Sequence, residues 1–304
     1  TGGAGFLGSH LIDKIIKNKE SIICIDNFST GRKKNIVHFL NNPRFRLINH
    51  DIRKPIDIKV NKIWHLASPA SPTIYQKNPI ETSEINFLGT LNMLKLAKKN
   101  NAKILFASSS EVYGDPKIHP QKESYFGNVN PIGQRSCYEI GKRIAESLFF
   151  DFSRKYNLDI RIARIFNTYG PRLSKKDGRV INNFICQALS NKPLTIYGNG
   201  LQTRTFCFVD DLIEGLISLM GSKYNLPINI GSEEEIRILK LAEIIKSKIN
   251  PTLKIKNFPL PNDDPMRRRP DLTAAKKILQ WESKIKINEG LDCTIKYLKS
   301  NYSI

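Results

Sequence analysis

A tyrosine and a lysine stand four residues apart at Tyr138 and Lys142, so a helix would present a phenol and an ammonium on one face. The positive charge would lower the pKa of the phenol, which could then accept a hydroxyl proton while hydride leaves the same carbon. Ser109 lies 29 residues earlier, at the end of a predicted strand, where its hydroxyl could hold the substrate alcohol. A single Tyr-x-x-x-Lys pair is usually a surface coincidence, so the interpretation depends on other residues.

Glycines crowd the opening stretch TGGAGFLGSH, where Gly3-x-Gly5-x-x-Gly8 matches a dinucleotide-binding fingerprint. Such a turn follows a buried parallel strand, so we expect a strand before the first residue and hence a fragment of a longer protein. Asp26 stands 18 residues after Gly8, near the offset of an acid that binds adenosine ribose hydroxyls. The alternative role for this carboxylate is to cap the turn that follows. A carboxylate there repels a 2′-phosphate and favours NAD over NADP, although the basic run 32–34 argues faintly the other way.

Short β-branched runs alternate with helical patterns over the first half of the chain. The runs predict buried strands, and the segments between them carry apolar residues at helical spacing. The predicted strands are 21–26, 45–50, 62–66, 103–108 and 159–165, and the predicted helices are 9–17, 85–99 and 138–156. This alternation indicates an α/β fold, a Rossmann-type doubly wound parallel sheet.

The pattern becomes irregular after Gly170, with shorter elements and the loops 172–179, 197–203 and 259–270. We therefore predict an NAD-binding Rossmann domain over residues 1–170, to which a segment near 205–231 returns. A smaller C-terminal lobe over residues 171–304 would bind the substrate.

The composition is that of a globular protein, with 40% hydrophobic and 25% charged residues. No apolar run approaches the roughly 20 residues that span a bilayer. The net charge is +20, but the lysines are spread along the chain without basic–aromatic tracts. We therefore expect a solvated surface rather than a nucleic-acid partner, with a positive field that could steer a small polyanionic substrate into a cleft.

Five cysteines and five histidines are scattered along the chain, without C-x-x-C or H-x-x-x-H pairs. This spacing predicts free thiols and no metal site. Free thiols favour a reducing, cytoplasmic location, and an anchor upstream of the first residue remains open.

The helices predicted over 85–99 and 138–156 have broad apolar faces. On the second helix, apolar residues recur every fourth position at Ile140, Ile144 and Leu148. A homodimer interface is one interpretation of these faces, and core packing explains them about as well.

Several longer stretches of the sequence carry a family resemblance. Through them the sequence resembles, over nearly the whole chain, the extended short-chain dehydrogenase/reductase superfamily and, within it, the UDP-glucuronate decarboxylase (UDP-xylose synthase) family. The stretches include DNFSTGRKKN (26–35), HLASPASP (65–72), SSSEVYGDP (108–116), NPIGQRSCYEIGKR (130–143), ARIFNTYGPR (163–172), YGNGLQTRTF (197–206) and DDPMRRRPD (263–271).

One motif separates the subclasses of this superfamily. Sugar-nucleotide 4,6-dehydratases place Asp-Glu before Val-Tyr-Gly, whereas Ser110 replaces that Asp here. The 4-epimerases usually carry a small residue where Glu111 stands, so the pair Ser110-Glu111 resembles the decarboxylase pattern. The family usually has Thr at the position of Ser109, and serine keeps the hydroxyl.

The resemblance implies three groups of site residues. Arg268 would hold a sugar carboxylate, although an arginine triplet alone is usually a solvated face. The catalytic residues would be Ser109, Ser110, Glu111, Tyr138, Lys142 and Arg268. The residues that bind NAD would be Gly2, Gly5, Phe6, Leu7, Asp26, Asn27, Phe28, Thr30, Gly31, Asp51, Ile52, Leu66, Ala67, Ser68, Asn86, Tyr138 and Lys142. The UDP-sugar residues would be Pro69, Tyr75, Asn167, Arg172, Arg179, Tyr197, Gln202 and Arg204.

The resemblance also implies a reaction. Bound NAD would oxidise carbon 4 of UDP-glucuronate, carbon dioxide would leave the 4-keto sugar, and the retained NADH would give UDP-xylose. One alternative releases the UDP-4-keto-pentose, and another is a UDP-glucuronate 4-epimerase, which Glu111 and Arg268 disfavour. A non-catalytic NAD-sensing or RNA-binding module is disfavoured by the intact Ser, Tyr and Lys set.

Overall fold

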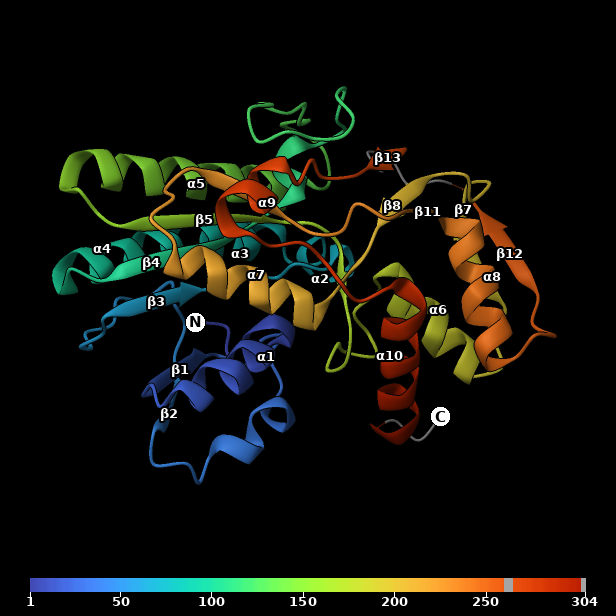
Figure 1. Ribbon diagram of the computed structural model, residues 1–304, viewed down its shortest axis with the longest axis horizontal. Coiled ribbons are helices and arrows are strands. Elements are labelled where there is room, and N and C mark those ends of the chain that lie inside the picture. Colours follow the sequence, from blue (N-terminus) through green and yellow to red (C-terminus); the bar gives the residue numbers. More distant parts are fainter. Residues whose placement is uncertain (260–264, 302–304) are drawn as a thin grey trace.

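A computed structural model of the protein describes residues 1–259 and 265–301, and parallel strands form its centre (Figure 1). One sheet has the order β10-β5-β4-β3, and a second pairs β1 with β2, all parallel. Residues 1 and 2 lie between them, because the Gly2 N–H donates to Ile25 O and the Leu66 N–H donates to Thr1 O. The strands are β1 (Ile22–Asp26), β2 (Phe45–Asn49), β3 (Lys62–His65), β4 (Lys103–Ser109), β5 (Ile160–Ile165) and β10 (Pro227–Ile230).

Alternate residues of β4 face opposite helix layers, as the two-residue period of a strand requires. Ile104 and Phe106 belong to a buried cluster with α4 and α5, whereas Leu105 belongs to a cluster with α1 and α7. Both faces of the sheet are therefore covered, which explains why its strands are apolar on both sides. The helices are α1 (Phe6–Ile15), α4 (Thr90–Asn100), α5 (Ser136–Tyr156) and α7 (Val209–Gly221).

The predicted elements of the first half are confirmed, and each predicted strand begins and ends within one residue of the observed one. The helix predicted over 9–17 begins earlier, at Phe6, because it starts directly after the glycine turn. The helix predicted over 85–99 begins as a π-helical turn, η4 (Ile85–Gly89), and continues as α4. The expected α/β fold with a doubly wound parallel sheet is therefore correct. The strand expected before the first residue stays a prediction.

The second half forms smaller sheets beside the main one, on the right of Figure 1. β8 (Thr203–Thr205) lies between β11 (Glu235–Arg237) and β13 (Arg267–Arg268), and β7 (Leu194–Tyr197) pairs with β12 (Ile255–Phe258). β13 lies inside the loop predicted over 259–270, so that loop is partly wrong, and its residues 260–264 lie outside the described residues. The remaining elements are α2 (Pro72–Tyr75), α3 (Pro79–Glu84), β6 (Thr168–Tyr169), α6 (Val180–Leu189), β9 (Cys207–Phe208), α8 (Ile238–Ile249), α9 (Thr273–Leu279) and α10 (Ile287–Asn301).

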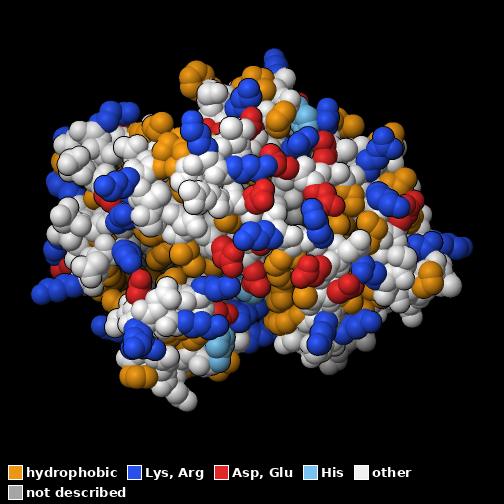
Figure 2. Space-filling view, in the orientation of Figure 1, with side chains coloured by type: hydrophobic (Ala, Val, Ile, Leu, Met, Phe, Trp, Pro, Cys, Tyr) orange, Lys and Arg blue, Asp and Glu red, His pale blue; other side chains and the backbone are white. Residues whose placement is uncertain are grey.

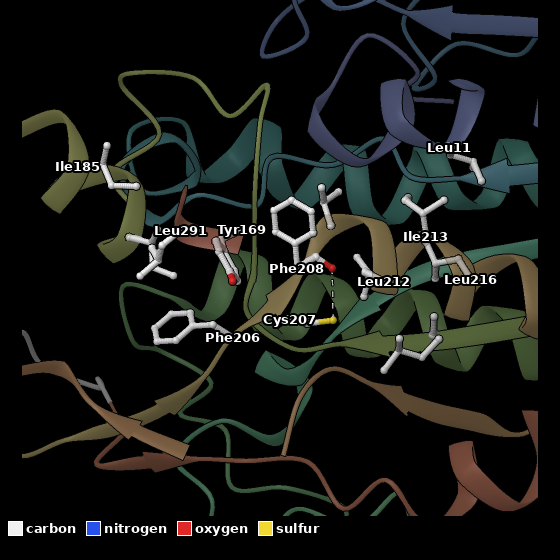
Figure 3. Packing of buried hydrophobic residues seen from close by; sticks show 14 of the residues in the cluster. Leu11, Tyr169, Ile185, Phe206, Cys207, Phe208, Leu212, Ile213, Leu216 and Leu291 are labelled. Carbon is white, nitrogen blue, oxygen red and sulfur yellow. Dashed lines mark hydrogen bonds between the residues drawn. The ribbon is translucent and has the colours of Figure 1, made fainter. Parts of the chain in front are cut away.

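One buried cluster joins the two halves of the molecule. Figure 3 shows Leu11 of α1 and Leu216 of α7 continuing through Phe208 to Ile185 of α6 and Leu291 of α10. The chain also returns to the main sheet, where β10 pairs with β5. A shared core of this kind holds the walls of a cleft between the halves in a fixed relation.

The surface is basic but mixed. Figure 2 shows Lys and Arg spread over this face, with Asp and Glu among them. No helix within residues 1–259 and 265–301 is long and apolar enough to cross a membrane.

Candidate active site

The glycine turn opens a cleft at the start of α1. Gly5 precedes the first residue of the helix without a side-chain cap, so the first amides of α1 are available to an anion. A Cβ on Gly8 would lie 2.2 Å from Gly2 O, and one on Gly3 would lie 2.4 Å from Cys24 Sγ. The glycines therefore permit the close contact of turn, strand and helix that a pyrophosphate site needs.

The structure shows Asp26 in the capping role and leaves it placed for the predicted ribose contact. Its Oδ2 accepts the Ala4 N–H at 2.9 Å and its Oδ1 accepts the Phe28 N–H at 2.8 Å, so it does cap the turn. It also lines the cleft, and each carboxylate oxygen retains a lone pair for a ribose hydroxyl. Burial raises the pKa of Asp26, and the two backbone hydrogen bonds oppose that rise. The glycine turn and this carboxylate, together on one cleft, fit a dinucleotide.

Most residues predicted for NAD line this cleft, namely Gly2, Gly5, Phe6, Leu7, Asp26, Asn27, Thr30, Asp51, Ile52, Leu66, Ala67 and Ser68. The structure places three others beside it. Phe28 contributes its N–H to Asp26, and a Cβ on Gly31 would lie 2.6 Å from the same carboxylate. Asn86 is buried and accepts the hydroxyl of Ser68 at 3.0 Å. These three residues shape the cleft from behind its walls.

Tyr138 and Lys142 lie one turn apart on α5, and both are buried. Lys142 Nζ donates to Ala107 O at 2.9 Å and lies 5.5 Å from the centre of the Tyr138 ring. Burial lowers the pKa of Lys142 to about 7. The expectation of a lowered phenol pKa is wrong for this structure. Burial raises the pKa of Tyr138 and Glu111 adds to the rise, and together they outweigh the hydrogen bond with Ser109 and the charges of Arg179 and Arg268.

Ser109 ends β4 beside the phenol. Its Oγ accepts the Glu111 N–H at 3.2 Å and so caps the short helix η5 (Ser110–Tyr113). This cap turns Ser109, Ser110 and Glu111 into the cavity that also holds Tyr138. The carboxyl end of a central strand thus carries the predicted catalytic serine, as open α/β sheets allow.

Glu111 is 9% exposed and lies between two guanidinium groups. Arg135 Nη2 is 2.7 Å and Arg268 Nη1 is 3.4 Å from Glu111 Oε1, and the Tyr75 hydroxyl donates to Oε2 at 3.4 Å. Burial acts to raise the pKa of Glu111, but Arg135 and Arg268 outweigh it, so that pKa is lowered. The Tyr75 ring stacks on Tyr138, with centroids 4.9 Å apart.

Most residues predicted for catalysis and for the substrate line one cavity of about 560 Å³. Its walls include all of Ser109, Ser110, Glu111, Tyr138, Lys142, Asn167, Arg179, Tyr197, Gln202, Arg204 and Arg268. The cofactor cleft adjoins this cavity, because Leu7, Leu66 and Ser68 line both. Bound side by side, a dinucleotide and a sugar nucleotide would meet near Tyr138.

Three residues predicted for the substrate lie elsewhere. Pro69 and Arg172 line the cofactor cleft, and Arg172 Nη1 pairs with Asp13 Oδ2 at 2.5 Å. Tyr75 is fully buried behind Tyr138 and does not line the cavity. It contacts Glu111 and Tyr138, two of the predicted catalytic residues.

Sequence reasoning missed two features of the site. Arg135 stands one helical turn before Tyr138, and that i, i+3 spacing was the available signal. The segment before α6 also crosses the cleft, because the hydroxyls of Ser71 and Thr73 donate to Asp177 O. No local pattern announces that second contact, since its partners are 104 residues or more apart.

Comparisons with known proteins agree with this geometry. The chain belongs to the NAD dependent epimerase/dehydratase family, whose model matches residues 1–231. Among curated proteins it is 54% identical to UDP-glucuronic acid decarboxylase 3 of Arabidopsis thaliana over 292 residues, covering 96% of this chain and 85% of that protein. It is 52% identical to UDP-glucuronic acid decarboxylase 1 of Danio rerio over 297 residues, covering 98% of this chain and 71% of that protein.

Solved structures share the fold. A UDP-glucuronic acid 4-epimerase from Bacillus cereus, in complex with UDP-glucuronic acid and NAD, superposes with a TM-score of 0.90 at 29% identity, covering 99% of this chain and 98% of that one. DesIV, a dTDP-glucose 4,6-dehydratase from Streptomyces venezuelae with NAD and TYD bound, matches in fold with a TM-score of 0.90 at 23% identity, covering 99% and 96%. The expected NAD cofactor and superfamily are confirmed.

Proposed function

We propose that this protein converts UDP-glucuronate to UDP-xylose by decarboxylation. The observation that carries the proposal is Arg268, which is 4% exposed in the cavity beside Tyr138. Its Nε and Nη2 have no hydrogen-bond partner among the described residues. A buried guanidinium with spare donors suits a planar carboxylate, which UDP-glucuronate has and neutral UDP-sugars lack. The named activity of the relatives at 52% and 54% identity supports the same assignment.

The cofactor is NAD, held by the glycine turn and Asp26, and it supplies the reversible oxidation of carbon 4. Tyr138 accepts the proton of the 4-hydroxyl group, which Ser109 orients from the end of β4. Lys142, held 2.9 Å from Ala107 O, keeps its amine near that phenol. Arg268 holds the sugar carboxylate, which lies β to the new ketone and leaves as carbon dioxide. After the enolate left by carbon dioxide is protonated at carbon 5, return of the hydride to carbon 4, with the proton from Tyr138, would leave no net redox change.

The nucleotide end of the substrate belongs to the wall formed after β5. Arg179 and Arg204 offer guanidinium groups to the diphosphate, and Arg179 is paired with Asp177 at 2.5 Å. The Tyr197 ring is half exposed, 6.2 Å from that of Phe258, so one face remains for a uracil base. We propose that residues 171–304 act as the UDP-sugar lobe, and residues 1–170 with a returning segment near 205–231 as the NAD domain.

Product analysis separates this function from its alternatives. Purified protein is incubated with UDP-glucuronate and NAD, and the sugar nucleotide is identified by mass and proton NMR. UDP-xylose is the expected product. Release of UDP-4-keto-pentose with accumulating NADH, or of UDP-galacturonate without carbon dioxide, would replace the proposal with one of the other two reactions.

Arg268→Met tests the carboxylate contact directly. A charge-assisted hydrogen bond is worth about 1.5–3 kcal/mol, so turnover of UDP-glucuronate should fall roughly ten- to a hundredfold. Binding of NAD should be unchanged, because Arg268 does not line the cofactor cleft. Arg267→Met is the matched control, since that neighbour is exposed and pairs with Glu235. Equal turnover in wild type and Arg268→Met would contradict the proposal.

We also propose a homodimer through the continuous helix of η4 and α4 and through α5. Phe87 and Leu88 of η4 and Ile140 and Ile144 of α5 are each 38–40% exposed although apolar. Light scattering should report a dimer, and Ile144→Glu should shift it to monomer; a monomeric wild type would refute the interface.

All five cysteines are free, which supports a reducing, cytoplasmic location.

A further inference from the structure

Arg135 approaches Glu111 more closely than Arg268 does, at 2.7 Å against 3.4 Å to the same oxygen. Its backbone carbonyl accepts the Tyr138 N–H at 3.0 Å, so Arg135 belongs to the same helical turn as the phenol. Arg135 Nε also lies 3.4 Å from Glu139 Oε1 on the same helix. Arg135 is therefore fixed between two buried carboxylates, independently of any ligand.

Arg268 is held differently. It reaches Glu111 from β13, 157 residues away in sequence, through Nη1 alone. Its Nε and Nη2 remain without partners among the described residues. Unsatisfied donors on a buried cation are costly, so Arg268 is suited to exchange partners when an anion enters the cavity.

A substrate with its own carboxylate brings a second anion to Glu111. If Arg268 were the single cation present, the two carboxylates would share one guanidinium at close range. Like charges at such a distance favour protonation of one of them. A second cation that stays with Glu111 removes that conflict.

We propose that Arg135 is the resident counter-ion of Glu111, which leaves Arg268 to bind the carboxylate of the substrate. This inference rests on the proposed function. Arg135 is a positioning residue here, because it acts through Glu111 and keeps the two anions apart.

The proposal predicts a change in proton linkage when Arg135 is replaced by Met. In Arg135→Met, binding of UDP-glucuronate places two anions on Arg268, so the complex takes up a proton that the free protein lacks. Affinity should then weaken as pH rises, by roughly tenfold between about pH 6 and about pH 8, where one pKa unit corresponds to a factor of ten. In the wild type, the affinity for UDP-glucuronate relative to that for UDP-glucose should be flat over that range.

UDP-glucose, which has no carboxylate, is the internal reference. The other groups around Glu111 are Tyr75 from α2, Cys137, Tyr138 and Glu139 from α5, and Arg179 before α6. Lys142 titrates within the range, with a pKa of about 7, but it acts on both ligands. The ratio of the dissociation constants of UDP-glucuronate and UDP-glucose, measured by calorimetry on NAD-loaded protein, isolates the contribution of the carboxylate to binding.

Two variants complete the test. Arg135→Lys keeps the charge and should restore a flat ratio, and Arg154→Met removes an exposed arginine from the same helix and should match the wild type. A flat ratio in Arg135→Met, or equal weakening for both sugars, overturns the proposal. If Arg135→Met fails to bind NAD, the wild type decides. Greater proton uptake on binding UDP-glucuronate than on binding UDP-glucose, measured in buffers of different ionisation enthalpy, would also overturn the proposal.

Failure of the proposed function would appear separately. A wild type that binds UDP-glucuronate but releases no carbon dioxide would refute the reaction. The role of Arg135 would then still be decided by how the ratio of the two dissociation constants changes with pH. A wild type that does not bind UDP-glucuronate would overturn both.

Discussion

Replacing Glu111 with Gln should separate oxidation of the sugar from loss of carbon dioxide. The amide keeps the shape of the side chain and removes its charge. Glu111 contributes to the raised pKa of Tyr138, so the phenol should lose its proton more readily in Glu111→Gln. Formation of bound NADH should therefore be as fast as in the wild type or faster.

Loss of carbon dioxide should be slower, for a reason visible in the structure. As the carboxylate becomes neutral carbon dioxide, Arg268 loses its anion in a buried position. Glu111, 3.4 Å away, can take the guanidinium over, whereas a glutamine cannot pair its charge. The lost charge-assisted contact is worth about 1.5–3 kcal/mol, which corresponds to roughly ten- to a hundredfold in rate.

A single-turnover experiment measures both steps together, by NADH absorbance and by carbon dioxide release. The ratio of the second rate to the first should fall at least tenfold in Glu111→Gln, by the same estimate. Glu235→Gln is a matched control, because it removes the carboxylate that pairs with Arg267, next to Arg268. An unchanged ratio, or an equal fall in both rates, would refute the partner exchange.

Three further predictions follow from the same geometry. Tyr138→Phe keeps the ring and removes the proton acceptor, so bound NADH should form roughly 100- to 10,000-fold more slowly, while Tyr156→Phe on the same helix should not change the rate; near-normal turnover would disprove the base role. Asp26→Ala should narrow the preference for NAD over NADP and also destabilise the fold, because two backbone N–H groups lose their acceptor, whereas Asp26→Asn should keep more of the stability. A wild type that binds NAD and NADP equally would contradict the ribose assignment. Lys142 has a folded pKa of about 7 against an ordinary 10.5, so between those pH values the unfolded chain binds a proton that the folded chain lacks, and the stability of the wild type should rise with pH. Lys142→Met should be the more stable protein near neutral pH, and its advantage in thermal unfolding should shrink toward about pH 10. A stability difference that does not change with pH would exclude a titrating Lys142.

Much of the fold could be predicted because it is encoded locally. The run from Lys103 to Ser108 is apolar on both faces, and that pattern alone indicates a buried parallel strand. The loop over 259–270 was harder, because β13 is only two residues long and exists through its pairing with β8. A strand of that length has no periodicity to recognise.

The local chemistry was determined by the sequence itself. Spacing of four residues places Tyr138 and Lys142 on one helix face, and the glycine fingerprint fits a turn where a Cβ would collide with backbone. These relations depend on neighbours along the chain, so residue type and spacing suffice.

The tertiary structure decided which charged groups lie together. It brought Arg268 to Glu111 across 157 residues, and it placed Arg135 even closer to Glu111, a contact that no sequence motif indicated. It also reversed the expected direction for Tyr138, whose pKa is raised because burial removes water from the phenol. Desolvation and long-range pairing depend on what packs around a group, and a sequence specifies that only through the complete fold.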